Sequence, residues 1–127
     1  MTLPLAGLVV AVTRPAAQAA RVTELVTAAG ATPLLLPTIE IEPVALDAAT
    51  RARLVPDDFD WTIYTSANAV DCSLRQLPRP QRTRIAAIGR ATARALEERG
   101  LAVAAMPGTT SDSEGLLALD CFADLHG

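Results

Sequence analysis

The segment IYTSANAV (63–70) decides how this chain is interpreted, because a strand pattern changes into a helix pattern within it. It begins inside WTIYT (61–65), a short apolar run that is typical of a strand buried in a parallel sheet. Small polar residues then form a turn, and Ser66 is placed to cap the helix that follows. The segment therefore predicts a strand, a polar turn and a helix in direct succession.

The same order of patterns occurs twice more, at VAVTRPA (10–16) and AIGRATA (87–93). Apolar runs bounded by turn residues predict buried strands at 8–12, 32–37, 61–65, 85–89 and 101–106. One helical face, which ends at the helix-stopping Gly30, comprises Val22, Leu25, Val26 and Ala29. Strands that alternate with helices predict an α/β fold with a mainly parallel sheet.

The pattern of apolar and charged residues changes at residues 37–43, which predicts a boundary between two parts of the chain. The tetrapeptide IEIE (39–42) alternates apolar and charged residues between two prolines, which is typical of an extended, partly exposed segment. Two further helices are predicted after this segment. Asp47 is placed to cap a short helix that runs to Leu54. The last predicted helix carries an apolar line made of Leu117, Cys121 and Leu125.

Composition argues against several classes of function. Half of the 127 residues are hydrophobic, and the net charge of −3 gives no basic footprint for nucleic acid or an anionic membrane. No run approaches the roughly 18 apolar residues of a membrane span. Cys72 and Cys121 lie far apart and outside any CxxC, so we expect reduced core thiols in the cytoplasm. The single histidine, His126, makes a histidine-centred triad or metal cluster a poor interpretation.

Small polar side chains gather where the predicted strands end. In a parallel sheet these ends share one edge, where helix N-termini present backbone N–H groups and the positive end of the helix dipole. Such an edge binds anions without many lysines. The residues at these junctions are Thr13, Thr65, Ser66, Asn68 and Thr92. The alternative for each of them is a plain helix cap, and the neighbouring Arg14 could pair a ligand carboxylate or simply be solvated.

Several catalytic signatures are absent from the sequence. It contains no GxGxxG after a strand, no GxxxxGK[ST] loop and no GxSxG elbow. The carboxylate pairs at 57–58 and 97–98 are interpreted as solvated, and Tyr64 as a core residue. No nucleophile–base pair can be named, so an enzyme of this sequence would act by holding and shaping its substrate.

Six segments, taken together and in this order, resemble uroporphyrinogen-III synthase. They are VTRP (12–15), the helix end AAGA (28–31), LLLPTIEIEP (34–43), YTSANAV (64–70), AAIGRATARALEERG (86–100) and SDSEGLLAL (111–119). The combination of TSANAV with a later IGxxTA pattern is more specific than any piece alone. The resemblance covers the whole chain, but only about the first half of the family's length.

The resemblance implies flavodoxin-like parallel sheets in two α/β domains, the first of which is discontinuous in sequence. Residues 1–37 then form the opening β-α-β of that first domain, 38–43 a connector strand, and 44–127 a second domain that is incomplete at its C-terminal end. The chain corresponds to the first half of this two-domain synthase fold and looks like a truncated product. We therefore expect it to be inactive or nearly so alone, and to expose apolar surface on LVVAV and LLLP.

The resemblance also implies a reaction in tetrapyrrole (haem, sirohaem, cobalamin) biosynthesis. Hydroxymethylbilane loses water and closes to uroporphyrinogen III with inversion of its last pyrrole ring, without metal or cofactor. Backbone N–H groups and hydroxyls in the interdomain cleft hold the substrate's carboxylates, and hydroxymethylbilane synthase is the implied pathway neighbour. By motif position the substrate-binding residues are Thr13, Arg14, Thr65, Ser66, Ala67, Asn68, Gly89 and Thr92. Ser111 and Ser113 lie at the next helix start, and no catalytic residue can be assigned.

Two other interpretations remain open from the sequence. One is a complete small α/β binding or signalling module, although no acidic cluster follows the first strand, VVAVTRP (9–15), as a receiver-like domain would require. The other is a non-catalytic interaction domain that pairs with a different chain.

Overall fold

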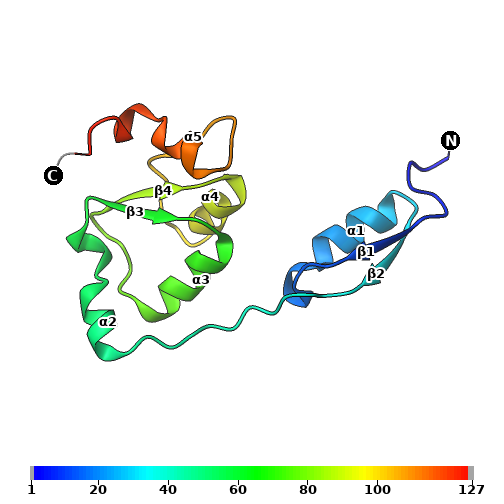
Figure 1. Ribbon diagram of the computed structural model, residues 1–127, viewed down its shortest axis with the longest axis horizontal. Coiled ribbons are helices and arrows are strands. Elements are labelled where there is room, and N and C mark those ends of the chain that lie inside the picture. The colour runs from blue at the N-terminus through cyan, green and yellow to red at the C-terminus, as the bar shows by residue number, and fades with distance from the viewer. Residues whose placement is uncertain (1, 126–127) are drawn as a thin grey trace. The chain divides into compact units, whose positions relative to one another are not determined.

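The computed structural model describes residues 2–125 and divides the chain into two compact units, residues 1–42 and residues 43–127 (Figure 1). Each unit is an α/β arrangement whose paired strands run parallel, as the sequence predicts. Within residues 2–125, no helix is both long and apolar enough to cross a membrane.

Unit 1 is a single β-α-β motif. Strand β1 (Val9–Val12) leads through a 3-10 turn (Ala16–Gln18) into helix α1 (Ala20–Ala28), and strand β2 (Thr32–Leu35) then pairs with β1. The predicted helix stop is confirmed: Gly30 adopts φ +92°, a left-handed conformation that disfavours any side chain.

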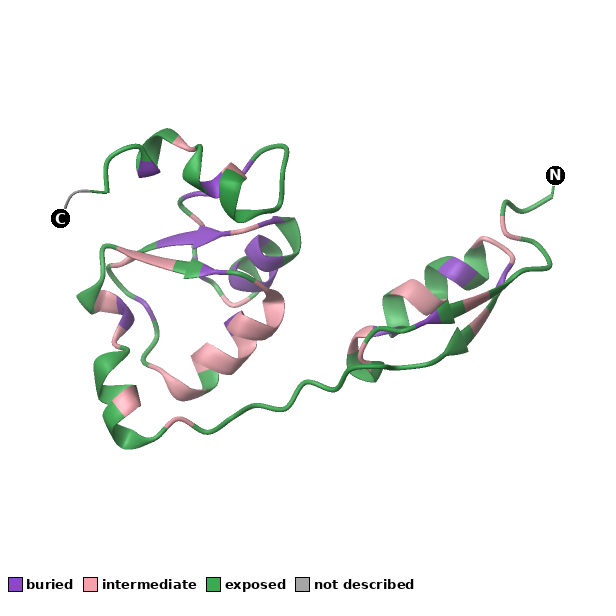
Figure 2. Ribbon diagram, in the orientation of Figure 1, coloured by how far each residue is buried: buried purple, intermediate pink, exposed green. Residues whose placement is uncertain are grey.

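The core of unit 1 lies on one face of its sheet only (Figure 2). The buried side chains are Val12, Ala19, Val26 and Ala31. Val9 is 68% exposed and Leu34 is 53% exposed, so the prediction that β1 and β2 are buried on both faces is wrong for the described residues. The physical reason is that α1 packs on one face, whereas side-chain alternation sends Val9 and Leu34 to the other.

Unit 2 is built around two paired strands and several helices. Its elements are α2 (Ala48–Arg53), a 3-10 turn (Pro56–Asp58), β3 (Trp61–Tyr64), α3 (Ala67–Gln76), β4 (Arg84–Ala87), α4 (Arg90–Glu97), α5 (Ser113–Leu117) and a second 3-10 turn (Asp120–Phe122). The predicted strand at 101–106 is reduced to a single parallel bridge between Ala105 and Ala86. The predicted cap of α2 is confirmed, since Asp47 accepts the N–H of Thr50, which holds the pKa of that carboxyl below its ordinary value.

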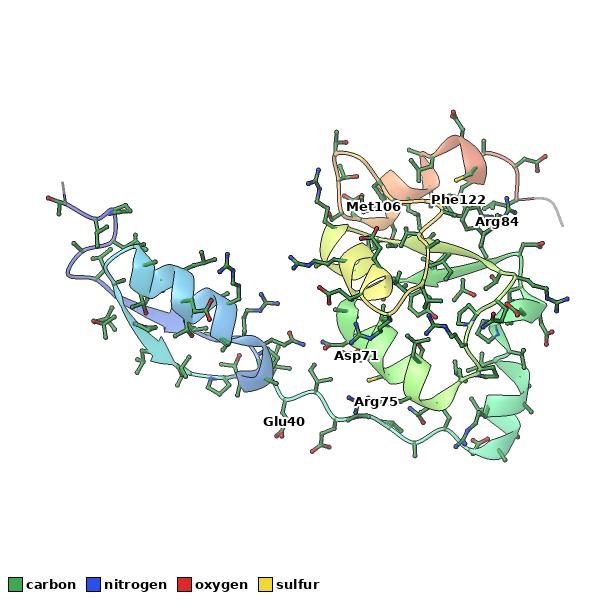
Figure 3. The ribbon with its side chains drawn as sticks, turned by 180° about the vertical axis from the view of Figure 1, so that it is seen from behind. Glu40, Asp71, Arg75, Arg84, Met106 and Phe122 are labelled. Atoms are coloured by element: carbon green, nitrogen blue, oxygen red, sulfur yellow. The ribbon has the colours of Figure 1, made fainter. Side chains whose placement is uncertain are left out.

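Two apolar clusters hold unit 2 together. The larger joins both strands to α3 and α4 and comprises Tyr64, Val70, Ile85, Ala87, Ala93, Ala95, Leu96 and Leu101. The prediction that Tyr64 is a core residue is confirmed, at 4% exposure. The smaller cluster is centred on Phe122, whose ring lies 4.6 Å from that of Trp61, and the Arg84 guanidinium stacks 4.3 Å above the Trp61 ring (Figure 3).

The C-terminal segment differs from its prediction. One continuous helix with Leu117, Cys121 and Leu125 on its buried side was expected, but α5 ends at Leu117 and those three residues are exposed. Leu116 and Phe122 provide the buried contacts instead. Cys121 is therefore a surface thiol and Cys72 a half-buried one, so neither is a fully buried core thiol as predicted.

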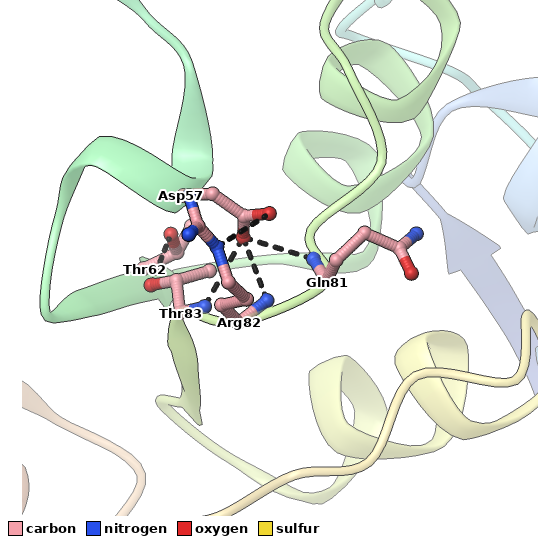
Figure 4. A network of polar contacts seen from close by, with 5 residues as sticks. All are labelled: Asp57, Thr62, Gln81, Arg82 and Thr83. Atoms are coloured by element: carbon pink, nitrogen blue, oxygen red, sulfur yellow. Dashed lines mark hydrogen bonds and ion pairs between the residues drawn. The ribbon is translucent and has the colours of Figure 1, made fainter.

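Asp57 is not the solvated carboxylate that the sequence suggested (Figure 4). Its Oδ1 accepts backbone N–H groups from Gln81, Arg82 and Thr83 at 2.9, 2.8 and 3.1 Å. These bonds hold the pKa of the Asp57 carboxyl below its ordinary value, and the bond from the Arg82 N–H has the largest effect. One carboxylate thus fixes the chain where it enters β4.

We predict that Asp57→Asn lowers the urea midpoint of unfolding at pH 7, because an amide oxygen accepts the three N–H groups without a negative charge. The lowered folded-state pKa means that the native contribution is present above about pH 4 and is lost as pH falls through that pKa. Urea titrations at several pH values should therefore show the two proteins converging toward acid. Asp58→Asn, one residue away on the exposed side, is the control and should match the native protein throughout.

We also predict that the uncovered face of β1 and β2 makes the chain associate at micromolar concentration. Sedimentation velocity should show the association reduced in the double variant Val9→Thr, Leu34→Thr. Val44→Thr changes a 79% exposed apolar residue outside the sheet and should leave association unchanged. Equal association in all three proteins would contradict this assignment of the adhesive surface.

Candidate functional site

The register of unit 2 places the ends of β3 and β4 side by side, next to the bridged segment at Ala105. Tyr64 at the end of β3 pairs with Ala87 at the end of β4, and the Ile88 N–H donates to the Tyr64 carbonyl at 3.0 Å. On the other side of β4, the Ala87 N–H donates to the carbonyl of Ala105 at 3.0 Å. The segments that follow β3, β4 and Ala105 therefore meet at one edge of the sheet, which we call the carboxyl edge of unit 2.

The first junction on this edge is the turn from β3 into α3. Ser66 caps the helix as predicted: its Oγ accepts the Ala69 N–H at 3.0 Å, and its carbonyl accepts the N–H of Val70. Thr65 is exposed at the strand end, while Ala67 and Asn68 are half-buried in the first turn. Ser66 thus accepts one of the free N–H groups at the start of α3. The Thr65 hydroxyl is the group at this junction that is most open to a ligand.

The second junction, from β4 into α4, has no side-chain cap. Gly89 occupies the capping position, and the first bond within the helix runs from the Ala93 N–H to the Gly89 carbonyl at 3.0 Å. The N–H groups of the first turn consequently have no acceptor inside the helix. Arg90 is exposed there, and Thr92 is only 4% exposed. This helix end is the stronger of the two as a place for an anion.

The third segment, residues 107–112, lies directly against the second junction. A Cβ at Gly89 would lie 2.8 Å from Ser111 Oγ and 2.9 Å from Ser111 Cβ, closer than real Cβ contacts. A Cβ at Gly115 would likewise meet Thr110 Oγ1 at 1.9 Å. Gly89 therefore lets this loop reach α4 and brings the Ser111 hydroxyl to its uncapped N-terminus, whereas Gly115 lets the same loop pack against α5 (Ser113–Leu117). The sequence placed Ser111 at a helix start but could not reveal this contact.

Thr13 and Arg14 belong to the separate carboxyl edge of unit 1. The Thr13 carbonyl accepts both the N–H and the hydroxyl of Thr38, at 3.3 and 3.2 Å. Arg14 is exposed. Beside them lies a groove of ≈ 550 Å³ lined by residues 15–17 and 37–41. Sequence reasoning missed this groove, because it depends on how the 3-10 turn and the segment after β2 face each other.

The predicted site residues thus fall into two sets. Thr65, Ser66, Ala67, Asn68, Gly89 and Thr92 share the carboxyl edge of unit 2, and Thr13 and Arg14 lie in unit 1. No cluster of three or more His, Cys, Asp or Glu side chains suited to a metal occurs in residues 2–125. The arrangement offers hydroxyls and helix N-termini, which suits the binding of carboxylates.

Comparison with known proteins assigns the chain to a family. The family model of uroporphyrinogen-III synthase HemD matches residues 20–126. The chain belongs to the uroporphyrinogen-III synthase family. It is 36% identical over 107 residues to the uroporphyrinogen-III synthase of Synechococcus elongatus, covering 76% of this chain and 39% of that protein. It is 37% identical over 113 residues to a putative uroporphyrinogen-III synthase of Methanothermobacter thermautotrophicus, covering 84% and 44%.

The fold agrees with this assignment. The uroporphyrinogen-III synthetase of Helicobacter pylori matches with a TM-score of 0.74 at 18% identity, over 94% of this chain and 55% of that one. The predicted family and α/β class are therefore confirmed. The chain spans less than half of the length of these two curated relatives.

We predict that Gly89→Ala destabilises the chain by about 1–3 kcal/mol, because the added methyl overlaps Ser111. Gly89 has extended backbone, φ −170°, so the substitution tests the contact rather than backbone strain. Chemical denaturation should show the loss, and the second substitution Ser111→Gly should restore most of it. Gly108→Ala, where a Cβ meets nothing within 4 Å, is the matched control. A destabilisation that Ser111→Gly does not relieve would show that this contact is not its cause.

Proposed function

We propose that this chain serves the cyclisation of hydroxymethylbilane to uroporphyrinogen III, with loss of water and inversion of the last pyrrole ring. The observation that carries the proposal is the uncapped N-terminus of α4, which lies beside Ser111 and on the same sheet edge as Thr65, in a chain of this family. The bilane bears an acetate and a propionate on every ring, and such carboxylates suit hydroxyls and helix N-termini.

In this proposal the chain's residues bind and orient. Thr65 and Ser66 hold one carboxylate at the start of α3, with Ala67 and Asn68 in the same turn. Gly89 and Thr92 do the same at the start of α4. No nucleophile is required, because a linear bilane closes by itself, and holding it in one geometry decides which closure occurs. Cofactors are not part of the proposal.

The domain assignment belongs to the same proposal. Residues 1–37 open a discontinuous first domain, 38–43 form a connector strand, and 44–127 belong to the second domain. Thr13 and Arg14 bind the substrate from the first-domain part, where the Arg14 guanidinium pairs a carboxylate. We place the reaction in the cytoplasm, next to hydroxymethylbilane synthase as the supplier of the bilane.

The alternative is a non-catalytic binding or interaction module. The observation that favours it is coverage, since the chain spans 39% and 44% of the relatives described above. A module of this kind would keep the fold of unit 2 while losing its affinity for tetrapyrroles.

Binding of uroporphyrin III, the stable oxidised form of the product, separates the two possibilities. We expect fluorescence titration to show binding by the chain. Thr65→Val and Thr92→Val should each weaken it by roughly fivefold, because a single hydrogen bond contributes about 1 kcal/mol. Thr27→Val, which removes an exposed hydroxyl from α1, should leave the affinity unchanged.

Incubation with hydroxymethylbilane and chromatography of the porphyrin isomers then tests the reaction. We expect little isomer III above spontaneous closure from the chain alone, because it spans under half of its relatives. Absence of porphyrin binding, or equal affinity in all variants, would overturn the proposal in favour of the interaction module.

A further inference from the structure

The groove of unit 1 has the size and lining of a site for one small aromatic ring. Its walls are the 3-10 turn at 15–17 and the extended chain at 37–41, and its volume is ≈ 550 Å³. Ligand pockets in proteins typically measure about 300–1,000 Å³ and are mostly apolar with a few polar groups. Here the apolar part consists of two prolines, two alanines and two isoleucines.

Hydrogen bonds within unit 1 hold both walls in place. The Leu36 N–H donates to the Val12 carbonyl at 2.9 Å, which extends the β1–β2 pairing past the end of β2. Both donors of Thr38 then bind the Thr13 carbonyl. The opposite wall is closed by the Gln18 N–H, which donates to the Pro15 carbonyl at 2.8 Å. The groove is therefore formed in advance of any ligand, which lowers the cost of binding.

Glu40 is the one ionisable side chain among the residues that line the groove. It is exposed, projects from the extended segment after β2 (Figure 3), and forms no ion pair with any residue in 2–125. Because Glu40 belongs to the lining of the groove, its exposed carboxylate can accept an N–H group from a flat apolar ring held there. A charge-assisted bond of this kind is stronger than one between neutral groups.

We infer that this groove binds one pyrrole ring of the linear tetrapyrrole, with the ring N–H donating to the Glu40 carboxylate. The identity of the ligand rests on the proposed function. In a substituted pyrrole the N–H and the two carboxylate arms lie on opposite edges of the ring. Glu40 attracts the first edge and repels the second. Arg14, exposed and next to the wall residue Pro15, supplies positive charge for the arms. The groove thereby fixes which way round a ring is held.

A monopyrrole that carries one acetate and one propionate arm, with a free ring N–H, tests this inference on the 127-residue chain. Amide chemical-shift changes in a titration should concentrate on residues 16–18 and 38–41. Glu40→Gln should weaken binding by about fivefold or more, because it keeps an acceptor oxygen but removes the charge. Glu42→Gln, on the same segment but outside the groove lining, should leave the affinity unchanged. The N-methylated pyrrole should bind native protein as weakly as the parent compound binds Glu40→Gln.

Two results would overturn the inference. One is equal affinity of native protein and Glu40→Gln for the monopyrrole, and the other is chemical-shift changes confined to residues 43–125. Failure here is distinguishable from failure of the proposed function, because porphyrin binding is tested with Thr65→Val and Thr92→Val in unit 2. Loss of the unit 2 effect alone would reject the synthase proposal, and loss of the Glu40 effect alone would reject only the groove.

Discussion

The parallel register between β3 and β4 is the constraint on which the candidate site depends. The bond from the Ile88 N–H to the Tyr64 carbonyl aligns the two strand ends, and each helix starts almost immediately after its strand. A slip of two residues would keep the buried faces but would separate the start of α3 from the start of α4. In the proposed function the hydroxyls and helix N-termini act on one ligand, and this register is what brings them to one edge.

Local signals in the sequence predicted the elements well. The caps at Ser66 and Asp47 and the stop at Gly30 are decided by side chains or backbone conformations within a few residues, so a single sequence contains them. The apolar pattern alone predicted burial poorly, because burial depends on what packs on the second face of a sheet. The expectation from the resemblance, that LVVAV and LLLP expose apolar surface, is confirmed. The strands that contain Val9 and Leu34 have the composition of doubly buried strands. In the described chain α1 covers one face of these strands, and both residues lie on the other.

In the candidate site, too, features set by local sequence could be predicted and features set by tertiary contacts could not. Motif positions identified residues that the structure places on one edge of unit 2, from Thr65 to Thr92, because strand–turn–helix order fixes where a turn lies in a parallel sheet. Two features need tertiary contacts and could not be predicted. Ser111 meets Gly89 across a loop of irregular chain, and Glu40 lines a groove whose other wall is more than twenty residues earlier in sequence. The spacing of residues along the chain reveals neither the Ser111–Gly89 contact nor the pairing of the two groove walls.

The three bonds to Asp57 have a consequence for how unit 2 opens and closes. They join residue 57 to residues 81–83, so they close the stretch of chain that contains β3 and α3 at the end opposite the candidate site. Breaking one of these bonds gives the closed segment little conformational freedom, because its ends separate only when all three bonds are lost. We infer that β3, α3 and the entry to β4 form one cooperative folding unit. Rigidity at the carboxyl edge of unit 2 is then maintained from the far side of the sheet.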